Sequence, residues 1–309
     1  MELLWDPELG SLRPKTVEIN SALQEITASL PPISVQPITE IRSKIPPLNE
    51  VESAESRTIG NSLPVRILKP YNPIGVILHM HGGGWVAGSH DAQDPILQRY
   101  VDSTGLAVVS VGYPLAPEDP YPAAPDACEA AAIWLLSNSK IEFGTERLLI
   151  MGESAGAHLA TVTLLRLRDK HQAVDRFIAA NLLYGVYDLS QTPSQIRARS
   201  EESLSKDTLD WFRDSFLGDH NPELRRHPDI SPLYADLRQL PPALFSVGTA
   251  DPLLDDSLFM YERWRTAGND AELAIYPDAG HGLNVIPDHP MANYFNERMD
   301  RFIKEQLRD

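Results

Sequence analysis

Residues 148–159 constrain the fold most, because they join an apolar run, a serine between two glycines and a helix-forming segment. The run 148–151 is short enough for a buried strand, and the residues after position 156 are rich in alanine and leucine. Between them, residues 152–156 read Gly-Glu-Ser-Ala-Gly. Glycine lacks a Cβ atom, so it lets neighbouring backbone pass close to a tight turn. The stretch predicts a strand-turn-helix unit, or nucleophile elbow, that exposes the hydroxyl of Ser154.

The pentapeptide by itself also matches a plain strand-to-helix loop, so its role depends on the rest of the chain. The string His-Gly-Gly-Gly-Trp at 81–85 directly follows an apolar run at 76–80. Three consecutive glycines let backbone N–H groups turn toward a ligand, as in an oxyanion hole that binds developing negative charge. We expect the N–H groups of Gly83 and Gly84 to be donors, with Ala155 supplying a third.

An acid and a base follow the elbow in the chain. Asp251 lies just beyond the apolar run 243–247, at the expected carboxyl end of a strand, where catalytic groups collect in open α/β sheets. An Asp-Pro pair alone is more often a plain turn, and a lone loop histidine such as His281 is often incidental. The order Ser154, Asp251, His281 is nevertheless that of α/β-hydrolases, and it predicts a nucleophile, an acid and a base.

Strand-like and helix-like patterns alternate through most of the chain. This alternation predicts an α/β fold with a mostly parallel central sheet flanked by helices. The run 65–68 alternates in hydrophobicity, which is typical of an exposed edge strand. Dense apolar runs occur at 75–80, 106–111, 148–151, 177–183, 243–247 and 273–276, and helical patterns at about 123–136, 159–168, 257–266 and 291–307.

Two blocks break this alternation. Residues 1–60 are polar and interrupted by prolines, and residues 185–236 lack a strand pattern but contain a short aromatic helix around 209–217. A connection of this length is unusual inside a compact domain. The sequence therefore predicts a helical cap formed by 1–60 and the insertion 185–236, over a core of 61–184 and 237–309.

With these motifs, the chain resembles the hormone-sensitive-lipase-like branch of the α/β-hydrolase esterases, which carries His-Gly-Gly-Gly-Trp upstream of Gly-x-Ser-x-Gly. The resemblance covers 63–309 and includes the segment 113–118, Tyr-Pro-Leu-Ala-Pro-Glu. It implies an α/β-hydrolase fold with a cap built from N-terminal helices and an insertion after the sixth strand. It also implies that Ser154, Asp251 and His281 hydrolyse short- to medium-chain acyl esters through an acyl-enzyme, without a cofactor.

The sequence leaves other functions open. The same triad serves all acyl transfers, so a lactonase, deacetylase or amidase of a specific metabolite is an alternative, as is a non-catalytic small-molecule receptor. His79 and His81 lie on one face of a strand, as in a zinc site, but no further ligand cluster has suitable spacing, and we expect no metal. Four aromatic residues could line a substrate pocket or form cap core: Trp85, Trp211, Phe212 and Phe216.

Composition limits the partners. The formal net charge is −16, which argues against nucleic acid or an anionic membrane as a partner. The resemblance implies a small-molecule ester as the partner. The single cysteine, Cys128, excludes an intrachain disulfide and has the pattern of a core residue. No apolar run approaches the roughly 18 to 20 residues of a membrane span. We expect a cytoplasmic protein, and a homodimer is open.

Overall fold

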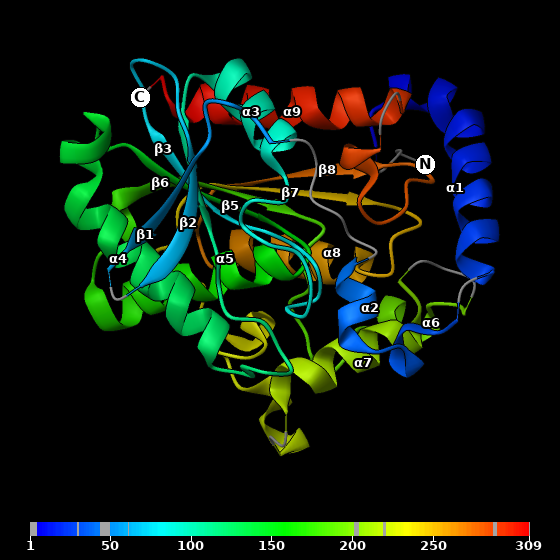
Figure 1. Ribbon diagram of the computed structural model, residues 1–309. Coiled ribbons are helices and arrows are strands. Elements are labelled where there is room, and N and C mark those ends of the chain that lie inside the picture. The colour runs from blue at the N-terminus through cyan, green and yellow to red at the C-terminus, as the bar shows by residue number, and fades with distance from the viewer. Residues whose placement is uncertain are drawn as a thin grey trace.

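An eight-stranded sheet forms the centre of the computed structural model, with helices on both faces (Figure 1). The structure describes residues 5–29, 31–43, 50–60, 62–200, 204–218, 221–286 and 289–308. The strands follow the order β1-β2-β4-β3-β5-β6-β7-β8. Their bounds are β1 Glu55–Ile59, β2 Leu63–Leu68, β3 Val76–Met80, β4 Ala107–Val111, β5 Leu148–Glu153, β6 Phe177–Leu183, β7 Ala243–Gly248 and β8 Ala271–Tyr276.

The sheet is mostly parallel, which confirms the predicted fold class. Strands β3 to β8 pair in parallel, whereas β2 pairs antiparallel with both β1 and β4. Every residue of β3 and β4 is buried, as expected for apolar strands covered on both faces. Because β3, β5, β6, β7 and β8 run in one direction, their carboxyl ends meet at one edge of the sheet, where ligand sites form in such folds.

The antiparallel end of the sheet corrects the prediction of an edge strand at 65–68. The alternating strand β2 is not an edge strand, because β1 pairs with it along residues 55–59. This pairing also places part of the expected cap segment 1–60 in the core sheet. The sequence did not reveal β1 because it is short and polar, with only Ile59 buried.

Helices cover the sheet in two layers (Figure 1). One face packs against α3 and α9, and the other packs against α4, α5 and α8, so that a separate apolar core forms on each side. The α5 helix begins at the elbow, four residues before the helical pattern at 159. The helix bounds are α1 Arg13–Ala28, α2 Ile38–Ser43, α3 Asp94–Thr104, α4 Ala123–Phe143, α5 Ala155–Arg166, α6 Pro193–Arg197, α7 Lys206–Leu217, α8 Leu254–Thr266 and α9 Pro290–Gln306.

The expected cap segments supply α1, α2, α6 and α7, which lie together beyond one end of the sheet in Figure 1. The guanidinium of Arg42 in α2 fastens this group to the core. It donates hydrogen bonds to the carbonyl oxygens of Val86 and Ala116 and forms an ion pair with Glu118 at 2.7 Å. The division into core and cap stays a prediction, and residues 1–4, 30, 44–49, 201–203 and 219–220 of the expected cap lie outside the described residues.

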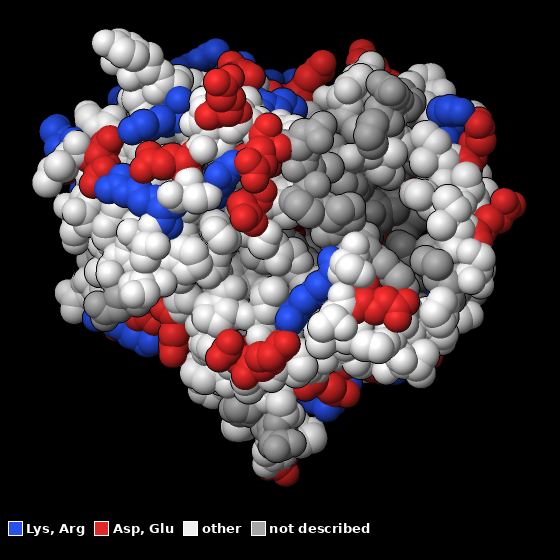
Figure 2. All heavy atoms as spheres, viewed as in Figure 1, with Lys and Arg blue, Asp and Glu red and all other residues white. Residues whose placement is uncertain are grey.

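One face of the molecule carries charges of both signs. In Figure 2 acidic and basic side chains lie next to each other in groups, the largest at the upper left, and form no continuous basic patch among the residues drawn in colour. None of the helices in the described ranges combines the length and apolarity that a membrane span requires. The cytoplasmic location and the homodimer stay predictions.

Candidate active site

The chain turns sharply at Ser154, between the end of β5 and the start of α5. Ser154 has φ 56° and ψ −119°, a backbone conformation that non-glycine residues rarely adopt. The following helix packs tightly on the sheet, because a Cβ atom at Gly156 would overlap the carbonyl oxygen of Met80 in β3. A Cβ atom at Gly152 would in turn overlap the backbone of Gly156. The two glycines therefore permit the predicted strand-turn-helix unit.

The structure brings Ser154, His281 and Asp251 into one hydrogen-bonded chain. Nε2 of His281 lies 3.0 Å from Oγ of Ser154, and Nδ1 lies 2.9 Å from Oδ2 of Asp251. The Asp251 side chain is fully buried, and its other oxygen accepts a hydrogen bond from the backbone N–H of Leu253 at 2.8 Å. The ring of Tyr184 packs edge-on against the imidazole, with 4.8 Å between centroids. The side chains of His281 and Asp251 are thus each held in place from more than one direction.

The glycine loop after β3 has the backbone conformation that its sequence predicts. Gly83 and Gly84 have φ values of 113° and 60°, in the region that glycine favours, and Trp85 also has a positive φ of 62°. Gly84 and Ala155 line the pocket that contains Ser154, whereas Gly83 is not among its described lining residues. Two of the three expected oxyanion donors therefore border the space beside the hydroxyl.

A carboxylate that the sequence analysis did not single out supports this loop. Oε1 of Glu153 accepts a hydrogen bond from the N–H of Gly82 at 2.9 Å, and Oε2 lies 2.9 Å from Nε2 of His79. Nδ1 of His79 lies 3.0 Å from Oγ of Ser110 in β4. Burial acts to raise the pKa of Glu153, but attraction to His79 and these hydrogen bonds outweigh it and lower the pKa. The side chain of Glu153, the residue before the proposed nucleophile, thus holds the first glycine of the loop, Gly82.

The two histidines around this loop have partners other than a metal. His81 stacks on Tyr113 with 4.2 Å between ring centroids, and its Nδ1 lies 2.8 Å from the carbonyl oxygen of Gly82. Burial lowers the pKa of His81 to about 4, so its imidazole is neutral near pH 7. Within the described ranges, no group of three or more histidine, cysteine or acidic side chains could hold a metal ion.

The pocket above Ser154 has mostly apolar walls and an empty volume of about 430 Å³, partly open to solvent. Trp85 and Phe212, two of the four aromatic residues expected to bind substrate, line it. Phe216 instead lies in the core, stacked on Trp85 at 4.5 Å, and Trp211 contacts Phe212 without lining the pocket. The other lining residues are Gly84, Ser154, Ala155, Val186, Leu189, Gln195, Leu204, Leu209, Arg213 and Leu253.

A buried histidine ties the pocket wall to the insertion. His158 lies one turn after Ser154 in α5, where its Nδ1 accepts a hydrogen bond from Nε1 of Trp85 at 3.2 Å. Its Nε2 then carries the proton and donates to the carbonyl oxygen of Ile230 at 2.9 Å. Burial lowers the pKa of His158 to about 4, which keeps the ring neutral. The position of Trp85 therefore depends on a residue with no recognisable sequence signal.

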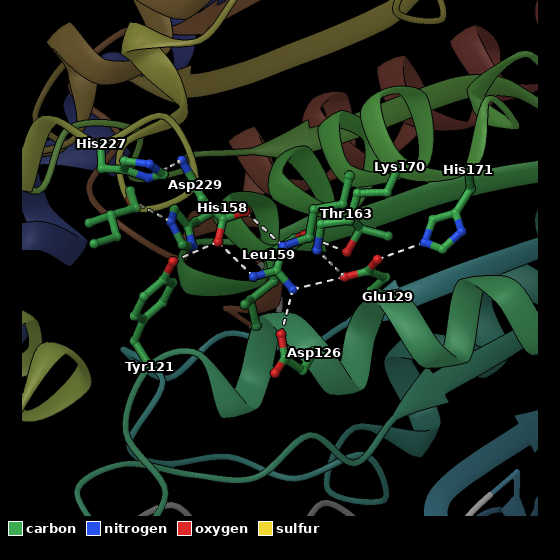
Figure 3. A network of polar contacts seen from close by, with 12 residues as sticks. Tyr121, Asp126, Glu129, His158, Leu159, Thr163, Lys170, His171, His227 and Asp229 are labelled. Atoms are coloured by element: carbon green, nitrogen blue, oxygen red, sulfur yellow. Dashed lines mark hydrogen bonds and ion pairs between the residues drawn. The ribbon is translucent and has the colours of Figure 1, made fainter. Parts of the chain in front are cut away.

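Farther along α5, Arg166 forms ion pairs with three acidic side chains that are labelled in the polar network of Figure 3. Its guanidinium makes a two-point ion pair with Asp229 at 2.6 and 2.7 Å and also contacts Asp126 and Glu129 at 2.7 and 3.0 Å. Tyr121 donates a hydrogen bond to Asp229 at 2.7 Å. Because Arg166 is buried and Asp229 belongs to the insertion, this cluster fastens the insertion to the core.

A second buried carboxylate orders the segment after β6. Asp256 in α8 accepts hydrogen bonds from the backbone N–H groups of Tyr187 and Asp188, at 2.7 and 3.0 Å. It also accepts from the side chains of Thr192 and Gln195, at 2.7 and 2.8 Å. Burial raises the pKa of Asp256 to about 7, against the opposing effect of these donors. The carboxylate thereby holds Gln195 at the pocket wall.

This fold and this arrangement of side chains define an α/β-hydrolase. Residues 77–284 match the sequence profile of a family described as alpha/beta hydrolase fold, and the chain belongs to that family.

Two ester hydrolases have sequences similar to that of this chain. The chain is 32% identical over 234 residues to an ethyl acetate hydrolase of Pseudomonas putida, covering 72% of this chain and 71% of that protein. It is 30% identical over 210 residues to an acetyl esterase of Salmonella choleraesuis, covering 67% of this chain and 64% of that protein. The match thus spans about 64% of the length of that esterase.

A solved structure supports the narrower resemblance. A hormone-sensitive lipase from a metagenome library superposes with a TM-score of 0.84 at 26% identity, covering 94% of this chain and 98% of that chain. The similarity therefore extends across the sheet, its helical layers and most of the expected cap segments.

Proposed function

We propose that the chain is a serine carboxylesterase that hydrolyses esters of short to medium acyl chains. The observation that carries this proposal is the hydrogen-bonded chain from Ser154 through His281 to Asp251 at the mouth of an apolar pocket. A nucleophile, a base and a group that orients the base are the parts that acyl transfer requires. The names of the ethyl acetate hydrolase and acetyl esterase relatives support an ester substrate.

In this mechanism His281 removes the proton from Ser154 as the hydroxyl oxygen attacks the ester carbonyl carbon. Asp251 fixes the proton on Nδ1, so that Nε2 is the acceptor, and stabilises the imidazolium that forms. The backbone N–H groups of Gly83, Gly84 and Ala155 would hold the oxyanion. His281 then gives its proton to the departing alcohol oxygen. Water repeats the sequence on the acyl-enzyme and releases the acid.

The close packing of the pocket walls supports short acyl chains. Phe212 packs directly against Gly84, because a Cβ atom at that glycine would overlap its ring. The side chains of Leu189 and Leu209 add to the wall. Trp85 and Phe212 are the two aromatic residues that we assign to substrate binding.

The decisive experiment compares wild type with Ser154→Ala on p-nitrophenyl esters from acetate to dodecanoate. We expect hydrolysis of the shorter esters to fall by at least about a thousandfold in the variant, since it removes the nucleophile. Ser137→Ala, a substitution of an exposed serine in α4, is the matched control and should retain full activity. Unchanged hydrolysis in Ser154→Ala would refute the proposal.

Two alternatives are tested with the same proteins. Rapid labelling of Ser154 by an organophosphonate distinguishes an enzyme from a receptor, because an unactivated serine reacts slowly. Faster turnover of lactones, N-acyl amines or a single acetylated metabolite than of simple esters would instead favour a lactonase, amidase or deacetylase.

A further inference from the structure

Two pockets border the hydrogen-bonded pair Ser154 and His281. The Ser154 pocket is the one described above, with apolar walls that include Val186 and Leu209. The second, the His281 pocket, has an empty volume of about 490 Å³. Leu204 lines both pockets, so the two lie next to each other. The His281 pocket is lined by Asn20, Leu23, Gln24, Leu204, Ala250, Pro252, Gly280, His281 and Ile286.

Helix α1 forms one wall of the His281 pocket and is fastened to the loop that carries the histidine. The side-chain amide of Asn20 donates a hydrogen bond to the carbonyl oxygen of Asp278. Arg13 adds an ion pair to the Asp278 carboxylate at 2.6 Å. Gln24, one turn beyond Asn20 in the same helix, lines this pocket together with His281. Among the described residues, Gln24 makes no hydrogen bond, so its amide is available to a ligand.

The chemistry of ester cleavage separates the two ends of the substrate. After attack by Ser154, the oxyanion must face the N–H groups of Gly84 and Ala155, which line the Ser154 pocket. The leaving alcohol oxygen must lie within hydrogen-bond reach of Nε2 of His281, because that atom protonates it. The alcohol group therefore extends toward the His281 pocket, and the acyl chain toward the Ser154 pocket.

We propose that the His281 pocket binds the alcohol portion of the substrate and that Gln24 selects alcohols carrying a further hydroxyl group. This assignment rests on the proposed esterase function. An amide supplies both a donor and an acceptor, which match a hydroxyl group but not a hydrocarbon chain. A site built to hydrogen-bond a hydroxyl discriminates against the analogue that lacks it. The substrate class is then short-chain esters of polyols.

The test compares two acetates of similar size, glycerol monoacetate and n-butyl acetate. We expect wild type to favour glycerol monoacetate in kcat/KM, and Gln24→Leu to lower this preference about two- to tenfold, the effect of one hydrogen bond. Glu25→Leu, which adds the same side chain at the next, exposed position of α1, should leave the preference unchanged. Asn20 is left intact because it also holds the His281 loop.

A reciprocal variant shows whether the pockets are separate. Leu209→Ala enlarges the Ser154 pocket and should raise the activity on butyl hexanoate relative to butyl acetate. It should not change the preference for glycerol monoacetate over n-butyl acetate. The hexanoate-to-acetate ratio of Gln24→Leu should match wild type, which also shows that this variant is folded.

The outcomes separate the two proposals. Equal use of both acetates by wild type, or an unchanged preference in Gln24→Leu, would overturn the alcohol assignment while leaving the esterase function intact. Failure of wild type to hydrolyse any ester would refute the esterase function and the assignment together.

Discussion

Nδ1 of His281 lies 2.9 Å from the fully buried carboxylate oxygen Oδ2 of Asp251. A carboxylate in this position accepts a hydrogen bond from the N–H group at Nδ1, so the proton of the neutral imidazole lies on Nδ1 and Nε2 has none. That same Nε2 lies 3.0 Å from Oγ of Ser154, so the imidazole is oriented to accept the serine proton. The pair therefore sets both the tautomer and the direction of the proposed base.

Replacing Asp251 with asparagine tests this orientation. We expect Asp251→Asn to lower kcat by roughly 10⁴-fold with little change in KM, because the amide can stabilise the wrong tautomer of His281. Steady-state kinetics on a short p-nitrophenyl ester provides the measurement. Asp236→Asn, at an exposed position, serves as the control. A loss below about tenfold would mean that Asp251 does not orient the base.

Glu153 gives a prediction about the glycine loop. Glu153→Ala removes the acceptor for the N–H of Gly82, so we expect kcat to fall by about ten- to a hundredfold while KM changes less. Glu153→Gln keeps an acceptor oxygen and should recover most of the activity. If alanine and glutamine lower kcat equally, the hydrogen bond to Gly82 does not position the loop.

The buried imidazole of His158 predicts a specific pH dependence of stability. Its pKa falls from 6.5 to about 4 on folding, so the unfolded chain binds an extra proton between these values. The contribution of the neutral His158 to the free energy of unfolding is fully present above pH 6.5 and is lost as the pH falls toward 4. We expect His158→Asn to flatten the dependence of the unfolding free energy in this window by up to about 1.4 kcal/mol per pH unit.

Urea denaturation between pH 8 and 4.5 provides the measurement. Trp85→Phe is the matched control, because it removes the hydrogen bond to Nδ1 but leaves the imidazole buried. In Trp85→Phe the unfolding free energy should change with pH by the same slope as in wild type. An identical slope in His158→Asn would show that His158 takes up no proton on unfolding in this range.

The cluster around Arg166 makes a prediction about the insertion. Asp229→Ala leaves the buried guanidinium with Asp126 and Glu129, so we expect the free energy of unfolding to fall by about 2 kcal/mol rather than the full cost of an isolated buried charge. Asp169→Ala breaks an exposed ion pair and should cost less than about 1 kcal/mol. Equal losses in urea denaturation would contradict a structural role for this cluster.

Much of the fold follows from the sequence alone, because buried parallel strands are dense apolar runs and the helices between them have helical spacing. The elbow was also readable, since close packing of α5 on β3 leaves room only for glycine at position 156. Asp251 and His281 carried a signal through their order in the chain. The short polar strand β1 had no such signal, because one buried residue does not form a pattern.

Side-chain partners across the fold could not be predicted. His79 and Glu153 are far apart in the chain and meet only because β3 and β5 are neighbours in the sheet. His158 looks like any residue of an alanine-rich helix until Trp85 and Ile230 are placed around it. The sequence also could not separate the four aromatic residues expected to bind substrate: Trp85 and Phe212 line the pocket, Phe216 lies in the core and Trp211 does neither.

The proposed separate pockets for the two ends of an ester have a consequence for the fate of the proposed acyl-enzyme. Once the alcohol departs, the space beside His281 is empty while the acyl group still occupies the space beside Ser154. Water must enter from the side that the alcohol left, and another alcohol fits there equally well. A polyol at high concentration would therefore compete with water for the acyl group and convert hydrolysis into transesterification.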